Sequence, residues 1–175
     1  MMNEVSPKHC HQVKRKEVLK MSIEAVKSYF AQFHLEDRIQ EFPVSSATVE
    51  LAAQALHTQP GRIAKTLSFL TKEEECILIL LAGDKKIDNH KFKETFGMKA
   101  KMPTPEQVAE KIGHSVGGVC PFAVPEGIKV YLDQSLREHE TVFPACGSSN
   151  SAIELSCEEL ARYANAVGWV DVSKA

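Results

Sequence analysis

Apolar residues recur at helical spacing in several parts of the chain. Ile23, Val26, Phe30 and Phe33 form one stripe near its start. Further helices are predicted over residues 35–41, 49–56, 88–96, 105–112 and 157–166. The last two have specific start signals. Thr104, Pro105 and Gln107 combine an N-cap, a proline at the first helical position and a capping-box glutamine, and Ser156 with Glu159 forms a second capping box.

Shorter apolar runs predict strands between these helices. Residues 65–70 and the run CILILLA at residues 76–82 are expected to pair as a hairpin across a charged turn. Four later strands are expected, over residues 128–133, 141–145, 151–155 and 169–172. This mixture of helices with closely spaced strands favours an α/β fold of the α+β type, in which helices surround a mixed, curled sheet.

The first twenty residues differ from the rest of the chain. They carry five basic residues and show no steady hydrophobic period, so we expect a basic leader over residues 1–20 and a single domain over residues 21–175. The leader is either a segment upstream of a natural start at Met21 or a flexible basic arm. A length of 175 residues suits one domain with a substantial core.

Composition limits the possible functions. The net charge of −2 excludes a strongly basic coat for nucleic acid, so any RNA contact must come from a local patch. The sequence shows neither an apolar run of about 20 residues nor a secretion signal, which predicts a protein without membrane association. Five widely spaced cysteines without a CxxC pair make a disulfide framework or zinc ribbon improbable, and a cytoplasmic location is expected.

Lys65 is the first candidate functional residue. It lies at the start of a predicted strand, among the apolar residues Ile63, Ala64 and Leu67. An ammonium group there can point into a cleft and offer three donors to an anionic or strongly polar oxygen. The alternative is an ordinary lysine whose stem lies along the strand end and whose charge reaches solvent.

The second candidate is the glycine-rich loop from Gly113 to Phe122. Bare N–H groups of Gly117, Gly118 and Val119 could bind an anion or a developing oxyanion. The loop lacks the Gly-Lys-Ser/Thr ending of a P-loop, and it follows a helix rather than a strand, which excludes a dinucleotide fingerprint. A glycine-rich surface turn remains the alternative.

Three further residues have both a functional and a structural interpretation. Cys120 is either a nucleophile or a buried structural thiol. His114 is either a base or RNA contact, or an exposed loop residue, and Ser148 lies either in a pocket wall or in a turn. Trp169 is expected in the core. No His, Asp or Glu spacing predicts a metal site.

Two motifs in this order resemble the YbaK/ProX family, the freestanding relatives of the editing domain inserted in bacterial prolyl-tRNA synthetases. The first motif is Lys65-Thr66-Leu67 after an alanine-rich helix. The second is the loop Gly113-x-x-x-Gly117-Gly118-Val119-x-Pro121-Phe122. The later segments Val130–Asp133 and Ile153–Leu155 also match, and the resemblance extends from about Ser22 to Val172.

The resemblance implies a partial barrel surrounded by helices and a trans-editing aminoacyl-tRNA deacylase. Such an enzyme hydrolyses the ester between a wrongly attached amino acid and the 3′-terminal ribose of tRNA, without a metal or other cofactor. The resemblance implies a catalytic role for Lys65 and for the amides of Gly117, Gly118 and Val119. The resemblance also implies that the substrate's ribose hydroxyl helps to position or activate water. The implied partner is mischarged tRNA, with prolyl-tRNA synthetase as a further candidate.

The substrate-binding residues expected from this resemblance lie on several segments. They are Ser46, Thr48, Thr66, Gly113, His114, Cys120 and Ser148. Alanine-specific relatives carry asparagine where this chain has Thr66, proline where it has Gly117, and a histidine that Phe143 replaces. Cysteine is therefore the first expected amino acid, with alanine, serine and threonine open. Two alternatives stand beside the deacylase: a non-catalytic module that binds aminoacyl-tRNA or a synthetase, and a thiol enzyme using Cys120.

Overall fold

The computed structural model describes residues 22–114 and 117–175, so the predicted leader lies outside the described residues. The first helix spans residues 22–31. The elements that follow are η1 (Glu36–Arg38), β1 (Ile39–Glu41), α2 (Val49–Ala55), η2 (Pro60–Arg62), β2 (Ile63–Leu70), β3 (Cys76–Ala82), β4 (Lys86–Ile87), α3 (Asn89–Phe96), α4 (Pro105–Ile112), β5 (Lys129–Asp133), η3 (Gln134–Glu138), β6 (Thr141–Pro144), β7 (Ser151–Ile153), β8 (Leu155–Ser156), α5 (Cys157–Tyr163), β9 (Gly168–Val170) and β10 (Ser173–Lys174).

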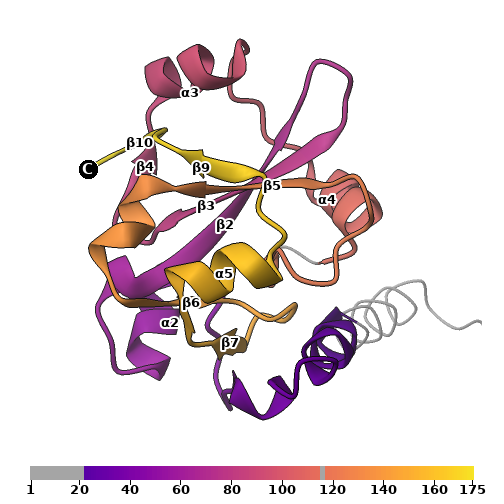
Figure 1. The fold of residues 1–175 in the computed structure, drawn as a ribbon, viewed down its shortest axis with the longest axis vertical. Helices are drawn as coiled ribbons and strands as arrows, with labels where there is room; N and C mark the ends of the chain where they lie inside the picture. Colours follow the sequence, from indigo (N-terminus) through magenta and orange to yellow (C-terminus); the bar gives the residue numbers. More distant parts are fainter. Residues whose placement is uncertain (1–21, 115–116) are drawn as a thin grey trace, which may run out of the picture.

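A mixed six-stranded sheet is the centre of the fold, as predicted. Its strand order is β8-β6-β2-β3-β5-β9, and both parallel and antiparallel neighbours occur in it. Two small sheets, β1-β7 and β10-β4, lie beside it. Figure 1 shows the strands curling between α2 on one side and α4 on the other, with α3 at one end of the molecule. The predicted α+β architecture is therefore confirmed.

The hairpin of β2 and β3 supplies the middle of the sheet. All seven residues of β3 are buried, which explains why CILILLA is a continuous apolar run rather than an alternating one. Its inward residues Leu78 and Leu80 join the main core, and Ile77 and Ile79 pack under α3 on the other face. Both faces of the hairpin are thus covered, and β2 is a rigid base for the side chains that it carries.

Helix ends follow the sequence signals closely. Both capping boxes form, with Thr104 and Gln107 at α4 and Ser156 and Glu159 at α5. Gly97 and Gly113 adopt the left-handed conformation directly after α3 and α4. Local chemistry alone therefore fixed where these helices begin and where α3 and α4 end.

The predicted helix over residues 35–41 is wrong. The chain makes a single 3₁₀ turn, η1, and then enters strand β1. His34 has a φ of +58°, which interrupts the helical path, and Ile39 pairs with Ile153 of β7. Pairing with a strand more than 100 residues later overrides the local helical preference, and sequence spacing cannot reveal such a partner.

Other differences concern element ends. The strand expected over residues 151–155 is divided at Glu154, because β7 pairs with β1 whereas β8 pairs with β6. Helix α5 ends at Tyr163 rather than near residue 166, and the closing strand β9 ends at Val170 rather than at 172. Trp169, expected in the core, is only half-buried, and the Arg137 guanidinium lies 3.9 Å from its ring centroid.

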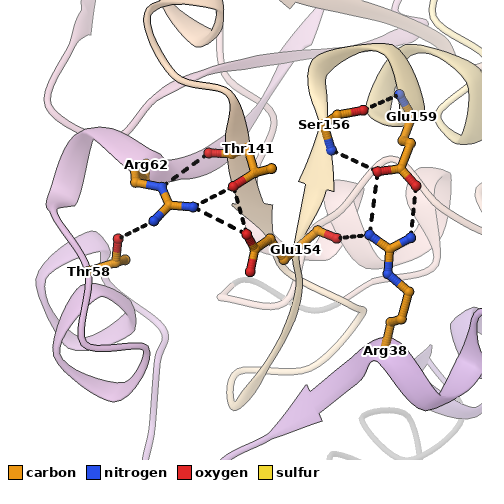
Figure 2. Close-up of polar contacts among 7 residues, drawn as sticks. All are labelled: Arg38, Thr58, Arg62, Thr141, Glu154, Ser156 and Glu159. Carbon is orange, nitrogen blue, oxygen red and sulfur yellow. Dashed lines mark hydrogen bonds and ion pairs between the residues drawn. The ribbon is translucent and has the colours of Figure 1, made fainter.

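Two arginines join segments that are distant in the sequence (Figure 2). Arg62 donates to the main-chain oxygen of Thr141 in β6 at 3.2 Å and forms an ion pair with Glu154 at 3.4 Å. Arg38 pairs with Glu159 at 2.8 Å and donates to the Glu154 carbonyl. The Arg62 contacts hold β6 against the beginning of β2, where the two strands pair, and the Arg38 contacts join η1 to the start of α5. No helix in the described part of the chain combines the length and apolar character needed to cross a membrane.

Candidate active site

A cavity of about 470 Å³ follows strand β2 from Ile63 to Ser68. Its lining comes from α2 and the loop before it, from β2, from the segment that leads into α4, from the glycine-rich loop, and from β6 and β7. Lys65, Gly117 and Val119 all contact it. The lysine and the glycine-rich loop, predicted to act together, therefore meet in one cavity although about 50 residues separate them.

The ammonium of Lys65 is held by main-chain oxygens of the turn after β3. Its Nζ donates to the Gly83 carbonyl at 3.3 Å and also to the Lys85 carbonyl. Gly83 packs closely against Pro60, which only glycine permits, because a Cβ there would be 2.3 Å from the Pro60 carbonyl oxygen. An ammonium has three donors, so this arrangement fixes the group and leaves one N–H for a ligand.

Burial and neighbouring charges act in opposite directions on Lys65. Burial lowers its pKa, and the carboxylates of Asp84 and Glu50 raise it in part. The side chain is half-buried. A partly desolvated cation interacts more strongly with a developing negative charge than one in bulk water does, because the local dielectric constant is lower.

The glycine-rich loop is pressed against the segment around Ser148. A Cβ at Gly118 would lie 2.8 Å from the main-chain atoms of Ser148, so only glycine fits without a shift of the backbone. Gly117 has a φ of +93°, in the left-handed region that favours glycine. Gly118 lies behind the lining that Gly117 and Val119 provide. The glycines thus bring the main chain itself, rather than side chains, to the cavity.

His114 anchors this loop instead of lining the cavity. It is 1% exposed, its Nε2 lies 2.8 Å from the Phe122 carbonyl oxygen, and its Nδ1 lies 3.2 Å from Ser22 Oγ. Burial lowers the pKa of His114, whereas the contact with the Phe122 carbonyl raises it. The expected substrate contact by an accessible histidine is not present, because the ring joins the two ends of the loop to the helix of residues 22–31.

Cys120 has a structural environment as well. Its side chain is fully buried, and burial raises the pKa of its thiol to about 12, with opposing hydrogen bonds from the main chain. A thiol of this kind is protonated at neutral pH and inaccessible to a substrate. The structure therefore contradicts the thiol-enzyme alternative. Cys120 was also expected to bind substrate, but it does not line the cavity.

The remaining predicted residues divide into two groups. Ser46, Thr48 and Thr66 line the cavity, although the Thr48 hydroxyl also caps α2 by accepting from Leu51 N–H. Gly113 and Ser148 do not line it. Gly113 is the left-handed residue that ends α4. Ser148 is buried, and its hydroxyl is hydrogen-bonded to Asn150 Oδ1 and to Ser151 Oγ. Both residues support the loop from behind.

Sequence reasoning missed the apolar residues at the two ends of the cavity. The end beside α2 is lined by Val49, Ala52, Ile63, Phe143 and Ala152. The end beside α4 is lined by Met102, Pro103, Pro105 and Val108. The apolar face of α2 was visible as a periodic pattern, but nothing in the pattern distinguished a cavity wall from core. Within residues 22–114 and 117–175, no group of three or more His, Cys, Asp or Glu side chains is arranged to hold a metal ion.

Comparison with known proteins agrees with this geometry. The family model of the aminoacyl-tRNA editing domain matches residues 44–163, which include every segment that lines the cavity. The chain belongs to the aminoacyl-tRNA editing domain family. It is 50% identical over 154 residues to YwhH of Bacillus subtilis (strain 168), a protein described as uncharacterized, with coverage of 88% of this chain and 98% of YwhH.

Two other relatives of this editing domain bear on the fold and the site. The proline–tRNA ligase of Aquifex aeolicus (strain VF5) is 32% identical over 108 residues, which are 58% of this chain and 19% of the ligase. A crystal structure of a protein proposed to be a trans-editing enzyme for prolyl tRNA synthetase superposes with a TM-score of 0.79 at 27% identity, covering 88% of this chain and 98% of that one. The family and its fold, both expected from the two motifs, are thereby confirmed.

Proposed function

We propose that the chain is a trans-editing aminoacyl-tRNA deacylase that releases a small amino acid from mischarged tRNA, with cysteine as the first candidate. The observation that carries the proposal is that Lys65 and two residues of the glycine-rich loop, Gly117 and Val119, line one cavity. The similarity to EbsC of Enterococcus faecalis (strain ATCC 700802 / V583), a protein proposed to be a Cys-tRNA(Pro)/Cys-tRNA(Cys) deacylase, supports the same activity. EbsC is 23% identical over 119 residues.

The proposed reaction is hydrolysis of one ester bond. Water attacks the carbonyl carbon, and negative charge develops on the carbonyl oxygen. Collapse of this intermediate breaks the bond to the ribose oxygen, which takes up a proton. Donors aimed at the developing charge lower the barrier, and loss of one such donor costs about 3–4 kcal/mol. The amides of the loop and the remaining N–H of Lys65 are the candidates for these donors.

Water activation in this proposal depends partly on the substrate. The side chains that line the cavity include no carboxylate and no histidine, and Lys65 is their one titratable group among the described residues. The ribose hydroxyl adjacent to the ester is therefore the best-placed polar group to orient the attacking water. This role predicts that a substrate lacking that hydroxyl binds but reacts slowly.

Selection of the amino acid is assigned to the α2 end of the cavity. Two of its five side chains, Ala52 and Ala152, are small, and they lie beside the larger Phe143. A closed apolar pocket excludes larger side chains by sterics, but it distinguishes two residues that differ by one methylene only about 10- to 200-fold. Cysteine, alanine, serine and threonine are all small enough to be tested against this pocket.

The test is a panel of mischarged tRNAs in which amino acid and tRNA are varied separately. Wild type and Lys65→Ala are compared by the rate of amino acid release. We expect a fall of about 10²- to 10³-fold in kcat for Lys65→Ala, because a charged donor at the transition state is lost. Equal rates would reject the role of Lys65. Tight binding of aminoacyl-tRNA without any release, even in single-turnover experiments, would favour the non-catalytic binding module instead.

A further inference from the structure

Strand β2 is paired unequally on its two sides. It pairs with β3 at seven positions, from Ala64 to Leu70, but with β6 only at Ile63 and Ala64. Beyond Ala64, strand β6 has ended, and the cavity occupies the place of a neighbouring strand along Thr66 and Ser68. An open strand edge inside a cavity is unusual, because unpaired main-chain groups are costly when they are kept from water.

The direction of the main-chain groups follows from one hydrogen bond. Leu70 N–H donates to the Lys101 carbonyl at 2.8 Å, so it points away from β3. In a strand, the N–H and C=O of one residue point to the same side, and the side alternates from residue to residue. The main-chain groups of Thr66 and Ser68 therefore also point away from β3. No hydrogen-bond partner for them occurs among the described residues.

Thr66 also carries an unpaired polar atom in its side chain. The side-chain Oγ1 of Thr66 is buried, yet it has no hydrogen-bond partner within the described part of the chain. Buried polar atoms in folded proteins are paired in the great majority of cases, so an unpaired one calls for an explanation. Thr66 thus adds an unpaired side-chain oxygen to the unpaired main-chain groups of this strand.

The wall of this part of the cavity is apolar. Met102, Pro103 and Pro105 line it, and Met102 is 59% exposed. The Lys101 carbonyl holds the start of this segment against Leu70, so the segment runs beside the open edge of β2. Flat apolar surfaces next to a short row of main-chain donors and acceptors suit a nucleobase, which has apolar faces and a polar rim.

We propose that the open edge of β2 binds the terminal adenine of the tRNA, with the Thr66 carbonyl accepting from the exocyclic amino group and the Ser68 N–H donating to the adjacent ring nitrogen. These two groups belong to residues i and i+2 and flank Leu67 on the same side of the strand. Adenine presents an acceptor nitrogen beside its amino donor on both its Watson–Crick and Hoogsteen edges. The inference rests on the proposed deacylase function and adds a recognition subsite to it.

The first experiment changes the substrate. The same tRNA and amino acid are prepared with a 3′-terminal adenosine, with purine riboside, which lacks the amino group, and with 1-deaza- and 7-deazaadenosine, which each lack one ring nitrogen. We expect kcat/KM to fall about 5- to 150-fold for purine riboside and for one of the two deaza analogues, because a two-point contact gives discrimination of this size. Equal kcat/KM for all four substrates would overturn the proposal.

The second experiment changes the protein at one atom of the main chain. Ser68→Pro removes the N–H, which no strand partner uses, whereas Ser68→Ala removes the hydroxyl and keeps the N–H. We expect Ser68→Ala to retain the discrimination against the sensitive deaza analogue and Ser68→Pro to lose it. Unchanged discrimination in a folded Ser68→Pro, checked by its melting temperature, would overturn the assignment. If this variant does not fold, the four-substrate series decides alone.

The two proposals fail in different ways. Without hydrolysis of any adenosine-terminated substrate, the deacylase function fails, and binding of the four tRNAs to the protein then tests the adenine subsite by affinity. With hydrolysis that is insensitive to the terminal base, the deacylase function holds and the adenine subsite is rejected.

Discussion

The two ends of the cavity are built differently. At the α2 end, Val49, Ala52, Ile63, Phe143 and Ala152 belong to one packed apolar cluster. At the α4 end, exposed Met102 and two prolines face a strand edge whose main-chain groups are unpaired. The first end has a fixed size and few polar atoms, whereas the second has a polar edge and an open apolar wall.

This difference suits one cavity to the recognition of two chemically different parts of the proposed substrate. A packed pocket selects by volume, since its walls cannot move without disrupting the cluster behind them. A strand edge selects by the order of donors and acceptors and is indifferent to volume. Lys65 lies between the two ends on β2, where a group that joins two such parts, as an ester does, would be located.

The largest effect on activity is expected from a change in the glycine-rich loop. Gly118→Ala places a Cβ 2.8 Å from the Ser148 main chain, so the loop must move away from Ser148 and leave its position at the cavity wall. We expect kcat/KM to fall at least about 10²-fold for every substrate, because displacement of reacting groups by 1 Å has effects of that size. Gly168→Ala is the control, since nothing lies within 4 Å of a Cβ there. Normal activity in folded Gly118→Ala would show that the loop does not position the reaction.

The α2 end is tested by reducing its volume. Ala52→Leu projects a larger side chain toward the cavity from the buried face of α2. We expect losses of about 10- to 200-fold for the larger amino acids that wild type accepts and little change for alanine. Gln54→Leu adds the same side chain to the exposed face of this helix and serves as the control. An equal loss of activity for all amino acids would contradict the proposal that this end binds the side chain of the substrate's amino acid.

A change at the α4 end is expected to alter KM without altering the preference among amino acids. Met102→Ala removes part of the apolar wall, which corresponds to about 1 kcal/mol and a roughly fivefold rise in KM. Because the base is common to all substrates, the rise should be the same for each amino acid. Val167→Ala, at an equally exposed position outside the lining, is the matched control. An effect that depends on the amino acid would mean that the two ends are not separate.

The sequence predicted several polar and glycine positions of the cavity but not the apolar walls at its two ends. Lys65, Thr48 and Gly117 follow from local chemistry and from motif resemblance, and the structure places all three at the cavity. The open edge of β2 could not be predicted in this way, because it depends on where β6 ends relative to β2 in space. His114 was misjudged for a related reason: its burial comes from contact with Ser22, 92 residues earlier.

The last prediction concerns the stability of the loop that His114 anchors. Burial lowers the pKa of His114, so the folded protein keeps this ring neutral to a lower pH than the unfolded chain does. Below the unfolded value of about 6.5, the unfolded chain takes up a proton first, and the free energy of unfolding falls as the pH falls, by at most about 1.4 kcal/mol per pH unit for one group. Urea denaturation of wild type and His114→Gln at pH 7.5 and 5.5 measures this difference. The variant should be less stable at pH 7.5, since it loses the contacts with Phe122 and Ser22, but it should lose less further stability on acidification. Equal losses in both proteins would show that the ring is protonated in the folded loop, in which case Ser22 and the Phe122 carbonyl hold an imidazolium.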